Sequence, residues 1–535
     1  MKYWQNSGQN QTLHSRMHLN RIITQILLIL LSTAPLIAQN VSATKYEMVF
    51  SAIKGTTSKP DTIWISASNK KTETGNITIQ GDQASYFRLI TPKPSQLKPD
   101  KQEQIAVVFE PIEQFTGIAR ATISFEKLDL KVGLSGLSTR GLEGENEAPL
   151  AQIADALGYQ IDIGWTTLAN HTRPELQGRE LKPALFKKAS GGKVEIYPVA
   201  RYSPDFPVNF GYYTSSKNGP VQQQVGILST AEEYPEHQTL FPGLSQGEMY
   251  FDPGDNPFGF YAISPEHSLY SEDLWNIIYH PSHATHAVRI YPVRDKNGAE
   301  LINTYLVCME EAANGDYNDY VFLVKNIQPV WLQDEFLGLL NGKDFTGWYT
   351  WLETKGKNND PENIFTMADG GILHDIGKEL GYIMTERSFG NFHFRLEFKW
   401  GERRWPPRDT LKRDSGICYN IPEDEADHIW PKSVECQIQE GDVGDFWLLG
   451  YSTIQADGKQ NPPLRHSRIV KMKDGERPNG EWNTVEVISF NGKCVHIVNG
   501  VVVNYGENSS LIGGRILLQS EYAEVYYRNI FIREL

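Results

Sequence analysis

The stretch Pro431–Trp447, PKSVECQIQEGDVGDFW, alternates apolar and polar side chains in its first half. Its apolar positions are Val434, Cys436 and Ile438, and its polar positions are Ser433, Glu435, Gln437 and Gln439. Successive side chains of a β-strand point to opposite faces, so the pattern predicts a strand with one face in a core and a second face carrying a carboxylate between hydroxyl and amide groups. Any half-buried antiparallel strand alternates in this way, so an ordinary strand with a solvated outer face stays open as the alternative.

A turn rich in glycine and acidic residues, 440–445, follows this strand and ends on Phe446 and Trp447. Hydrogen-bonding side chains in a row suit a ligand whose hydroxyl groups have a similar spacing, as those of a sugar do. Aromatic rings offer flat apolar surfaces on which sugar rings can stack. The stretch therefore suggests a sugar-binding sheet face, and the alternative is an ordinary strand and acidic turn.

The chain as a whole has 535 residues and a formal net charge of −14. This length is too great for one compact core and suggests about three or four domains. The acidic charge argues against general binding to nucleic acid or to anionic membrane surfaces. Short runs rich in Val, Ile, Tyr and Phe lie between Gly- and Pro-containing turns, and helical periodicity is nearly absent, so the fold class is predicted as mainly β and multidomain.

The N-terminal segment has the pattern of an export signal. Residues 1–40 contain no Asp or Glu, and an apolar run at Ile22–Leu31 is followed by small residues that offer cleavage after Ala38. Residues 1–38 are therefore predicted as a signal peptide, and the alternative is an N-terminal hydrophobic strand. The run is too short to span a membrane. We expect a secreted protein, either periplasmic or on the outside of a bacterial cell.

The four cysteines match no zinc-binding spacing. They are Cys308, Cys418, Cys436 and Cys494. Cys436 lies on the apolar face of the predicted strand, where a buried thiol is common. Cys418 and Cys436 could pair across neighbouring strands in an oxidising compartment, and the sequence leaves that pairing open.

Residues 41–141 read as a β-sandwich, because strand-like runs recur at roughly ten-residue spacing. The segment PDKQEQIAVVFEP at 99–111, with Tyr86-Phe87 before it and LSGL at 134–137 after it, resembles the immunoglobulin-like modules of the abnormal-spindle/Hydin and choice-of-anchor type. The resemblance implies an immunoglobulin-like spacer or docking module. A protein partner or a cell surface is therefore expected to bind through this domain.

Residues 150–330 form a second β-rich unit whose function the sequence does not assign. Its loop NGDYNDYVF at 314–322 gathers Asp316, Asn318 and Asp319 around a glycine. Oxygen atoms grouped in this way can hold Ca²⁺, the one cofactor that the sequence suggests. The full EF-hand spacing is absent, and the same residue types also favour plain turns.

The region 335–535 carries a series of motifs in a fixed order. They are LNGKDFTGW at 340–348, ADGGIL at 368–373, GYIMTERSFGNFHFRLEFKW at 381–400, DSGICYN at 414–420, VECQIQ at 434–439, GEWNTVEV at 480–487, IVNGVVV at 497–503 and GRILLQSEYAEVYYRNIFI at 514–532. Their order and content resemble the bacterial 3-keto-disaccharide hydrolase domain family. The resemblance implies a concanavalin-like jelly roll, two curved antiparallel sheets with a concave face that receives sugar.

The family resemblance also implies a chemistry, the cleavage of glycosides whose sugar carries a ketone at carbon 3. The ketone acidifies the C2 proton, so a base can remove it and expel the glycosidic oxygen, after which water adds. Glu435 and Glu521 are the candidate acid and base, and Arg413 is the candidate stabiliser of the ketone or enolate. Many family members carry His-Gly where this chain has Glu521-Tyr522, which leaves the identity of the base or metal ligand open.

Candidate substrate-binding residues come from the same strands and their flanks. They are Gln437, Gln439, Tyr419, Glu397, Trp447 and Trp405. Each has a structural alternative, since Glu435 could be a buried carboxylate held by arginine and either tryptophan could be core. The basic insertion 450–477 could be a lid or a solvated loop. The leading hypothesis is a carbohydrate-active enzyme, and the alternative is a non-catalytic carbohydrate-binding or adhesion protein on the same fold.

Overall fold

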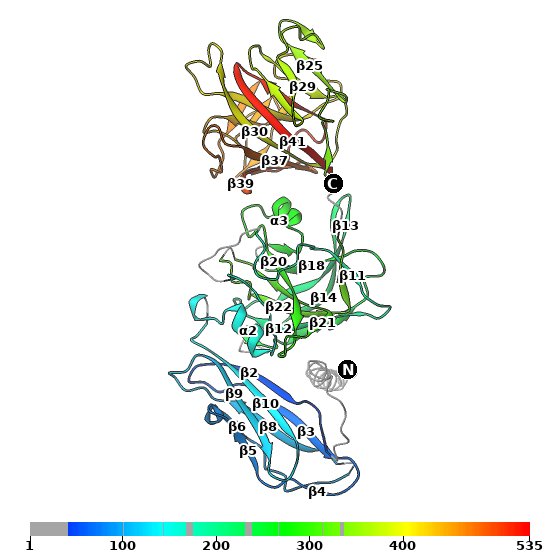
Figure 1. Cartoon of the computed structure of the whole chain (residues 1–535), viewed down its shortest axis with the longest axis vertical. Coiled ribbons are helices and arrows are strands. Elements are labelled where there is room, and N and C mark those ends of the chain that lie inside the picture. The colour runs from blue at the N-terminus through cyan, green and yellow to red at the C-terminus, as the bar shows by residue number, and fades with distance from the viewer. Residues whose placement is uncertain are drawn as a thin grey trace, which may run out of the picture. The chain divides into compact units, whose positions relative to one another are not determined.

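The computed structural model describes residues 41–99, 101–142, 144–166, 175–229, 238–265, 267–312, 314–331 and 336–535. Nearly all of its regular elements are strands (Figure 1), which confirms the predicted mainly β class. The predicted signal peptide lies outside the described residues. Among the helices that are described, none is long and apolar enough to cross a membrane.

The chain divides into two compact units. The first contains the described residues up to Thr214, together with Val221–Glu272 and His286–Val330. The second contains Ser215–Pro220, Asp273–Thr285 and the described residues from Trp331 onward. The division into domains at 41–141, 150–330 and 335–535 remains a prediction.

The N-terminal part of the first unit is a sandwich of two four-stranded sheets. One sheet has the order β1 (Val41–Ala43), β3 (Asp61–Ala67), β8 (Glu103–Phe109), β6 (Phe87–Leu89). The other has the order β2 (Glu47–Ile53), β10 (Lys131–Thr139), β9 (Gly117–Phe125), β5 (Ile77–Gln80), and a small pair joins β4 (Thr72–Glu73) to β7 (Gln96–Leu97). Alternating side chains of these strands, such as Ile63, Ile65 and Ile123, form one buried core.

The remainder of the first unit is also built of sheets. One contains β15 (Thr239–Leu240), β12 (Val194–Arg201), β22 (Tyr320–Lys325), β21 (Glu300–Met309) and β20 (Val288–Arg294), with β17 (Tyr250–Phe251) on β12. A second contains β16 (Leu244–Gly247), β14 (Gly219–Leu228), β13 (Val208–Ser216), β18 (Gly259–Ile263) and β19 (Ser268–Tyr270). A two-stranded sheet pairs β11 (Phe186–Lys188) with β23 (Ile327–Pro329), and α2 spans Leu150–Ala156.

The second unit is built on two eight-stranded antiparallel sheets (Figure 1). The first, sheet A, contains β27 (Phe365–Ala368), β28 (Ile372–Asp375), β41 (Ala523–Glu534), β30 (Phe392–Arg404), β37 (Asn483–Phe490), β38 (Lys493–Val498) and β39 (Val501–Gly506), with β24 (Leu337–Gly338) on β41. The second, sheet B, has the order β26 (Gly356–Lys357), β25 (Trp348–Leu352), β29 (Gly381–Thr385), β40 (Arg515–Ser520), β31 (Asp414–Ile421), β32 (Ser433–Gln439), β33 (Phe446–Leu449), β36 (His466–Ile469). A small pair joins β34 (Gln455–Ala456) to β35 (Lys459–Gln460), and α3 (Asp273–Tyr279) packs Trp275 against Phe490.

The core of the second unit lies between sheets A and B. The apolar residues of FHFRLEF in β30 alternate with polar ones and are fully buried, as the sequence pattern predicts. They pack in one cluster with Ile417, Tyr419, Val434 and Ile438 of sheet B. The dipeptide Asn491-Gly492, which is typical of hairpin turns, joins β37 to β38 with positive φ at both residues, as a tight two-residue turn requires. The jelly-roll architecture is therefore confirmed.

Candidate functional site

Strands β31, β32 and β40 of sheet B turn a set of polar side chains away from the core. Ile417 on β31 pairs in register with Cys436 on β32 and with Leu518 on β40, and all three side chains belong to the core cluster. Residues one position away from them therefore point to the opposite face of the sheet. We call this opposite face the polar face, and its members are Asp414, Glu435, Gln437, Gln439, Gln519 and, directly after β40, Glu521.

Asp414 is the centre of the first row of side chains on the polar face. It pairs in register with Gln439 on β32, whose Nε2 donates a hydrogen bond to Asp414 Oδ2 over 2.6 Å. The β31–β40 register, continued by three residues from Ile417 and Leu518, places Glu521 on the other side of Asp414. The guanidinium group of Arg408 donates to Asp414 Oδ2 and, over 3.2 Å, to Glu521 Oε2. One arginine thus joins two carboxyl groups.

The two carboxyl groups of this row have pKa values above those of ordinary acidic side chains. Burial raises the pKa of Asp414 to about 6, against the opposing charge of Arg408. Burial raises the pKa of Glu521 well above its ordinary value, and the charges of Asp414 and Glu435 add to that rise. Like charges this close resist simultaneous ionisation, so the pair carries one proton near neutral pH.

Glu435 lies further along the polar face and is 4% exposed. Burial, and then the charge of Asp414, raises its pKa well above the ordinary value of a glutamate, which favours the neutral form of the carboxyl group. A Cβ atom at Gly416 would collide with Glu435 Oε1 and with Gln519 Oε1. Because Gly416 has no side chain, it leaves a small space over β31, and the ends of the Glu435 and Gln519 side chains meet there. We call this space the notch. Gln519 Oε1 has no other hydrogen-bond donor among the described residues, and the neutral acid can donate to it.

Aromatic side chains border this group of acids. Trp447 on β33 pairs in register with Glu435 and contacts a second apolar cluster on this side of sheet B. Tyr382 belongs to that cluster and Trp351 packs against it, and their stacked rings have centroids 5.3 Å apart. Tyr382 also donates its hydroxyl to Asp427 Oδ1 over 2.9 Å, which ties the loop between β31 and β32 to this end of the face. The face thus combines carboxyl groups, amides and flat aromatic surfaces.

Two predicted substrate-binding residues lie elsewhere, and those predictions are corrected. Tyr419 points into the core, because it lies two residues after Ile417 on the same strand and so shares its face. Its hydroxyl group forms a hydrogen bond with His496 Nε2 over 2.9 Å. Glu397 lies on β30 of sheet A, where it accepts hydrogen bonds from Arg528 Nε and Asn529 Nδ2, each over 2.8 Å. Glu397 and Glu435 therefore lie on different sheets.

The other predicted residues lie on or beside the polar face. Gln437 is a member of it and folds back, so that its Oε1 accepts the backbone N–H of Ile438 over 2.9 Å. Trp405 sits at its edge, where the indole donates to the carbonyl of Ile376 over 2.9 Å. Arg413 pairs with Glu440 instead of the acid pair, because its side chain turns toward the acidic turn after β32.

The sequence interpretation missed Asp414, Arg408 and Gln519. Asp414 is the first residue of the motif DSGICYN, and its even spacing from Gly416 and Cys418 could have placed it on the polar face. Gln519 has the same parity as the predicted Glu521. Arg408 had no comparable signal, since it lies in a loop whose path depends on the fold.

All four cysteines are free and buried. Cys418 faces the second apolar cluster of sheet B, whereas Cys436 faces the core. A sheet separates the two thiols, so a disulfide between them is excluded in this fold. The pairing that the sequence left open is therefore absent.

The predicted calcium ligands are buried, and two of them make hydrogen bonds to the backbone of the chain. Asp319 Oδ2 accepts the backbone N–H of Glu311 over 2.6 Å, and Asn318 Nδ2 donates to the carbonyl of Ala148 over 3.0 Å. Burial raises the pKa of Asp316. Within the described part of the chain, no three His, Cys, Asp or Glu side chains form a group that could hold a metal ion. The calcium prediction is therefore not supported by this loop.

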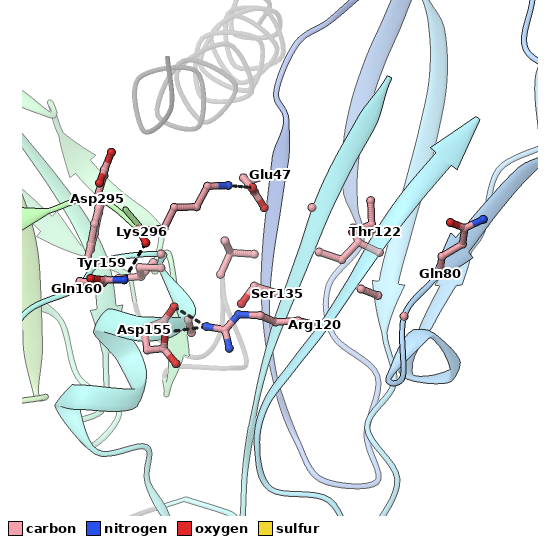
Figure 2. Close-up of a pocket in the computed structure, with 18 residues that line it drawn as sticks. Glu47, Gln80, Arg120, Thr122, Ser135, Asp155, Tyr159, Gln160, Asp295 and Lys296 are labelled. Atoms are coloured by element: carbon pink, nitrogen blue, oxygen red, sulfur yellow. Dashed lines mark hydrogen bonds and ion pairs between the residues drawn. The ribbon is translucent and has the colours of Figure 1, made fainter. Parts of the chain in front are cut away.

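The first unit contains a cavity of about 530 Å³ (Figure 2). Ion pairs between Lys296 and Glu47 and between Arg120 and Asp155, each 2.7 Å long, cross it. Its basic side chains are thus already neutralised by acids of the chain. The cavity brings together no set of neighbouring acids like that of the polar face.

Residues 335–533 match the family model of the 3-keto-alpha-glucoside-1,2-lyase-like domain. This confirms the resemblance that the sequence motifs indicated for the C-terminal region. No curated protein matches the chain.

Several solved structures are similar to the same part of the chain. A candidate glycosyl hydrolase from Parabacteroides distasonis is 20% identical, with a TM-score of 0.28, and the match covers 38% of this chain and 98% of that one. The carbohydrate-binding module CBM66 from Bacillus subtilis is 11% identical, with a TM-score of 0.26 and coverage of 37% and 99%. The Bacillus licheniformis β-glucanase is 9% identical, with a TM-score of 0.22 and coverage of 32% and 83%. Likenesses at this level say nothing about what the chain does.

Proposed function

We propose that the second unit cleaves glycosides whose sugar carries a ketone at carbon 3, by elimination followed by addition of water. The observation that carries the proposal is the pair Asp414 and Glu521, joined by Arg408 on the same face as a neutral Glu435. The family model of a 3-keto-alpha-glucoside-1,2-lyase-like domain over residues 335–533 supports it.

The acid pair is suited to the role of base. Near neutral pH the pair holds one proton and one negative charge, so its ionised oxygen can accept the C2 proton. The electrons of the C2–H bond then form the enolate of the C3 ketone. Collapse of the enolate expels the glycosidic oxygen from C1 and leaves a C1–C2 double bond, to which water adds in a second step.

Glu435 is suited to the role of acid. Its raised pKa keeps a proton on the carboxyl group near pH 7, and the leaving oxygen needs that proton as its bond to C1 breaks. Arg408 carries the positive charge nearest the acid pair and can stabilise the enolate oxygen. Gln437 and Gln439 can bind hydroxyl groups, and Trp447 can stack on a ring.

A carbohydrate-binding protein without catalysis is the alternative from another class. Sugar binding needs amides and aromatic rings, which this face also has. It has no need of three neighbouring carboxyl groups with raised pKa values, which cost free energy to bury. This cluster therefore favours the enzyme over the binding protein.

The test is incubation of the purified full chain with 3-keto glucosides and with the ordinary glucosides. We expect release of the aglycone from the 3-keto substrates alone, with the 2-hydroxy-glycal as the first product detected by NMR. The variants Glu435→Gln and Asp414→Asn should be impaired, and Glu397→Gln on sheet A should match the wild type. Retained glycan binding with no product from any substrate would establish the alternative.

We further propose that the chain is exported and that residues 41–141 and 150–330 are accessory domains. The apolar run and the small residues before Ala38 support export. Docking of a protein or cell-surface partner is assigned to the N-terminal sandwich. N-terminal sequencing of the protein from a bacterial periplasm should begin at Gln39, and an intact Met1 would contradict export with cleavage.

A further inference from the structure

Most of the polar face is closed in the structure, and Gln439 and Glu521 at its end are partly exposed. The exposed fractions are 4% for Asp414 and Glu435, 6% for Gln437 and 1% for Gln519. Groups with so little accessible surface cannot contact a sugar in this conformation. If these residues act on a ligand, some segment that covers them must move.

Two loops flank strand β31 in the sequence, one before it and one after it, and they are fastened very differently. The loop 422–432 is tied down by Asp427, which accepts from Tyr349 and Tyr382, and by Arg515, which donates to the carbonyls of Pro422 and Glu425. The loop 405–413 joins β30 to β31, and every residue from 406 to 412 except Arg408 is exposed. This second loop therefore has little buried surface to hold it in place.

The loop 405–413 reaches the body of sheet B through few contacts. At its start, the backbone N–H of Trp405 donates to the carbonyl of Tyr522 over 2.9 Å. In its middle, Arg408 binds Asp414 and Glu521. Near its end, Lys412 pairs with Asp442 over 2.7 Å at an exposed position, where ion pairs contribute little, and Arg413 binds Glu440 where the loop meets β31. Arg408 is thus the half-buried fastening between the two ends.

We propose that the loop 405–413 is a lid over the polar face, and that Arg408 is the latch that holds it closed on Asp414 and Glu521. Segments with few buried contacts open at low free-energy cost, and lids of this kind exclude water during a reaction. Opening of the lid separates the guanidinium group from the acid pair and admits a ligand, and closure brings the group back beside the pair. The role of the lid in turnover rests on the proposed function, whereas its movement does not.

The latch belongs to a different segment from the one that the sequence suggested as a lid. Basic side chains of the insertion 450–477 are engaged elsewhere, since Arg468 pairs with Asp445 over 2.5 Å and Lys471 pairs with Asp474 over 2.7 Å. Neither contacts Asp414 or Glu521. The loop 405–413, in contrast, contacts both members of the acid pair through Arg408.

The experiment measures opening without any substrate. Hydrogen–deuterium exchange of the full chain is followed by mass spectrometry for peptides covering 405–413. In parallel, carbodiimide with glycine ethyl ester labels accessible carboxyl groups. We expect Arg408→Ala to raise exchange of the loop by at least about tenfold and to make Glu435 and Asp414 open to labelling, with Arg408→Lys intermediate.

Arg413→Ala is the matched control, because Arg413 has similar burial and sits at the end of the same loop but pairs with Glu440. It should leave both readouts at wild-type values. The proposal is overturned if Arg408→Ala exchanges and labels like the wild type, or if Arg413→Ala has an equal effect. Thermal melting of each variant shows whether it is folded. If Arg408→Ala is unfolded, Arg408→Lys is compared with the wild type in its place. Absence of turnover on every substrate with normal latch behaviour would reject only the proposed function.

Discussion

Asp414, the first residue of β31, and Glu521, the residue after β40, face each other across neighbouring strands and are both bound by Arg408. Burial raises the pKa of both carboxyl groups, and each acts on the other. The arginine supplies one positive charge for the one negative charge that the pair carries near neutral pH. This arrangement gives a base whose ionisation depends on its neighbours.

Glu435→Gln tests the assigned acid. The amide has the same shape and keeps a donor for Gln519, but it cannot give a proton to the leaving oxygen. We expect kcat on a 3-keto glucoside to fall by about 10²–10⁴, with little change in the melting temperature. A substrate whose leaving group needs no proton, such as a 3-keto nitrophenyl glucoside, should be affected much less. Equal losses on both substrates would contradict the role as acid.

The pH profile of kcat/KM should have an acidic limb set by the acid pair. As pH falls through about 6, the ionised form of Asp414 gains a proton and the base is lost. The charge of Arg408 lowers the pKa of Asp414, so Arg408→Gln should move the limb to higher pH. The profile is measured for both proteins with the same 3-keto substrate. A limb that stays in place or moves to lower pH in Arg408→Gln would contradict this assignment.

Gly416→Ala should impair activity more than stability. The new Cβ would meet the ends of two flexible side chains, Glu435 and Gln519, which can shift aside. We expect a loss of about 1–3 kcal/mol in the free energy of unfolding and a fall in kcat of tenfold or more, because the acid moves from its notch. Gly390→Ala is the matched control, since a Cβ there meets nothing within 4 Å. Unchanged kcat in Gly416→Ala would show that the notch does not position Glu435.

Tyr419→Phe should destabilise the second unit without changing its substrate affinity. The hydroxyl is buried in the core, and its loss leaves His496 Nε2 without a hydrogen-bond donor. The expected cost is about 1–3 kcal/mol, measured by denaturant unfolding. KM should equal that of the wild type below the melting temperature. A raised KM would return Tyr419 to the substrate-binding residues.

The contribution of Glu435 to the stability of the fold should fall as pH rises above the acidic range. Glu435 has a raised pKa in the folded state, so its contribution is fully present below its unfolded pKa of about 4.3 and is lost as pH rises through the folded value. Glu435→Gln removes this dependence. The melting temperature of the variant relative to the wild type should therefore rise between pH 4 and pH 8. A constant difference across that range would contradict a buried, neutral Glu435.

Much of the fold is readable from local patterns. The alternation in Pro431–Trp447 and in FHFRLEF predicts strands with one core face, because the side-chain period of a strand is two residues. The Asn-Gly pair at 491–492 predicts its hairpin, because both residues tolerate positive φ. The same alternation predicts Glu435 on the polar side of its strand, whereas Glu521 was indicated by the family resemblance.

The alternation of side chains along a strand does not tell which sheet the strand joins or which part of the sheet a loop contacts. Glu397 has a polar-face pattern but belongs to sheet A, and Tyr419 fell on the core side of β31. The meeting of Asp414, Glu521 and Arg408 requires β31 and β40, about a hundred residues apart in the chain, to become neighbours. The sequence alone therefore determined the strands and their two faces, since these follow from neighbouring residues. Only the tertiary structure decided which carboxyl groups share a proton and which loop covers them, since burial and pairing depend on segments that lie far apart in the chain.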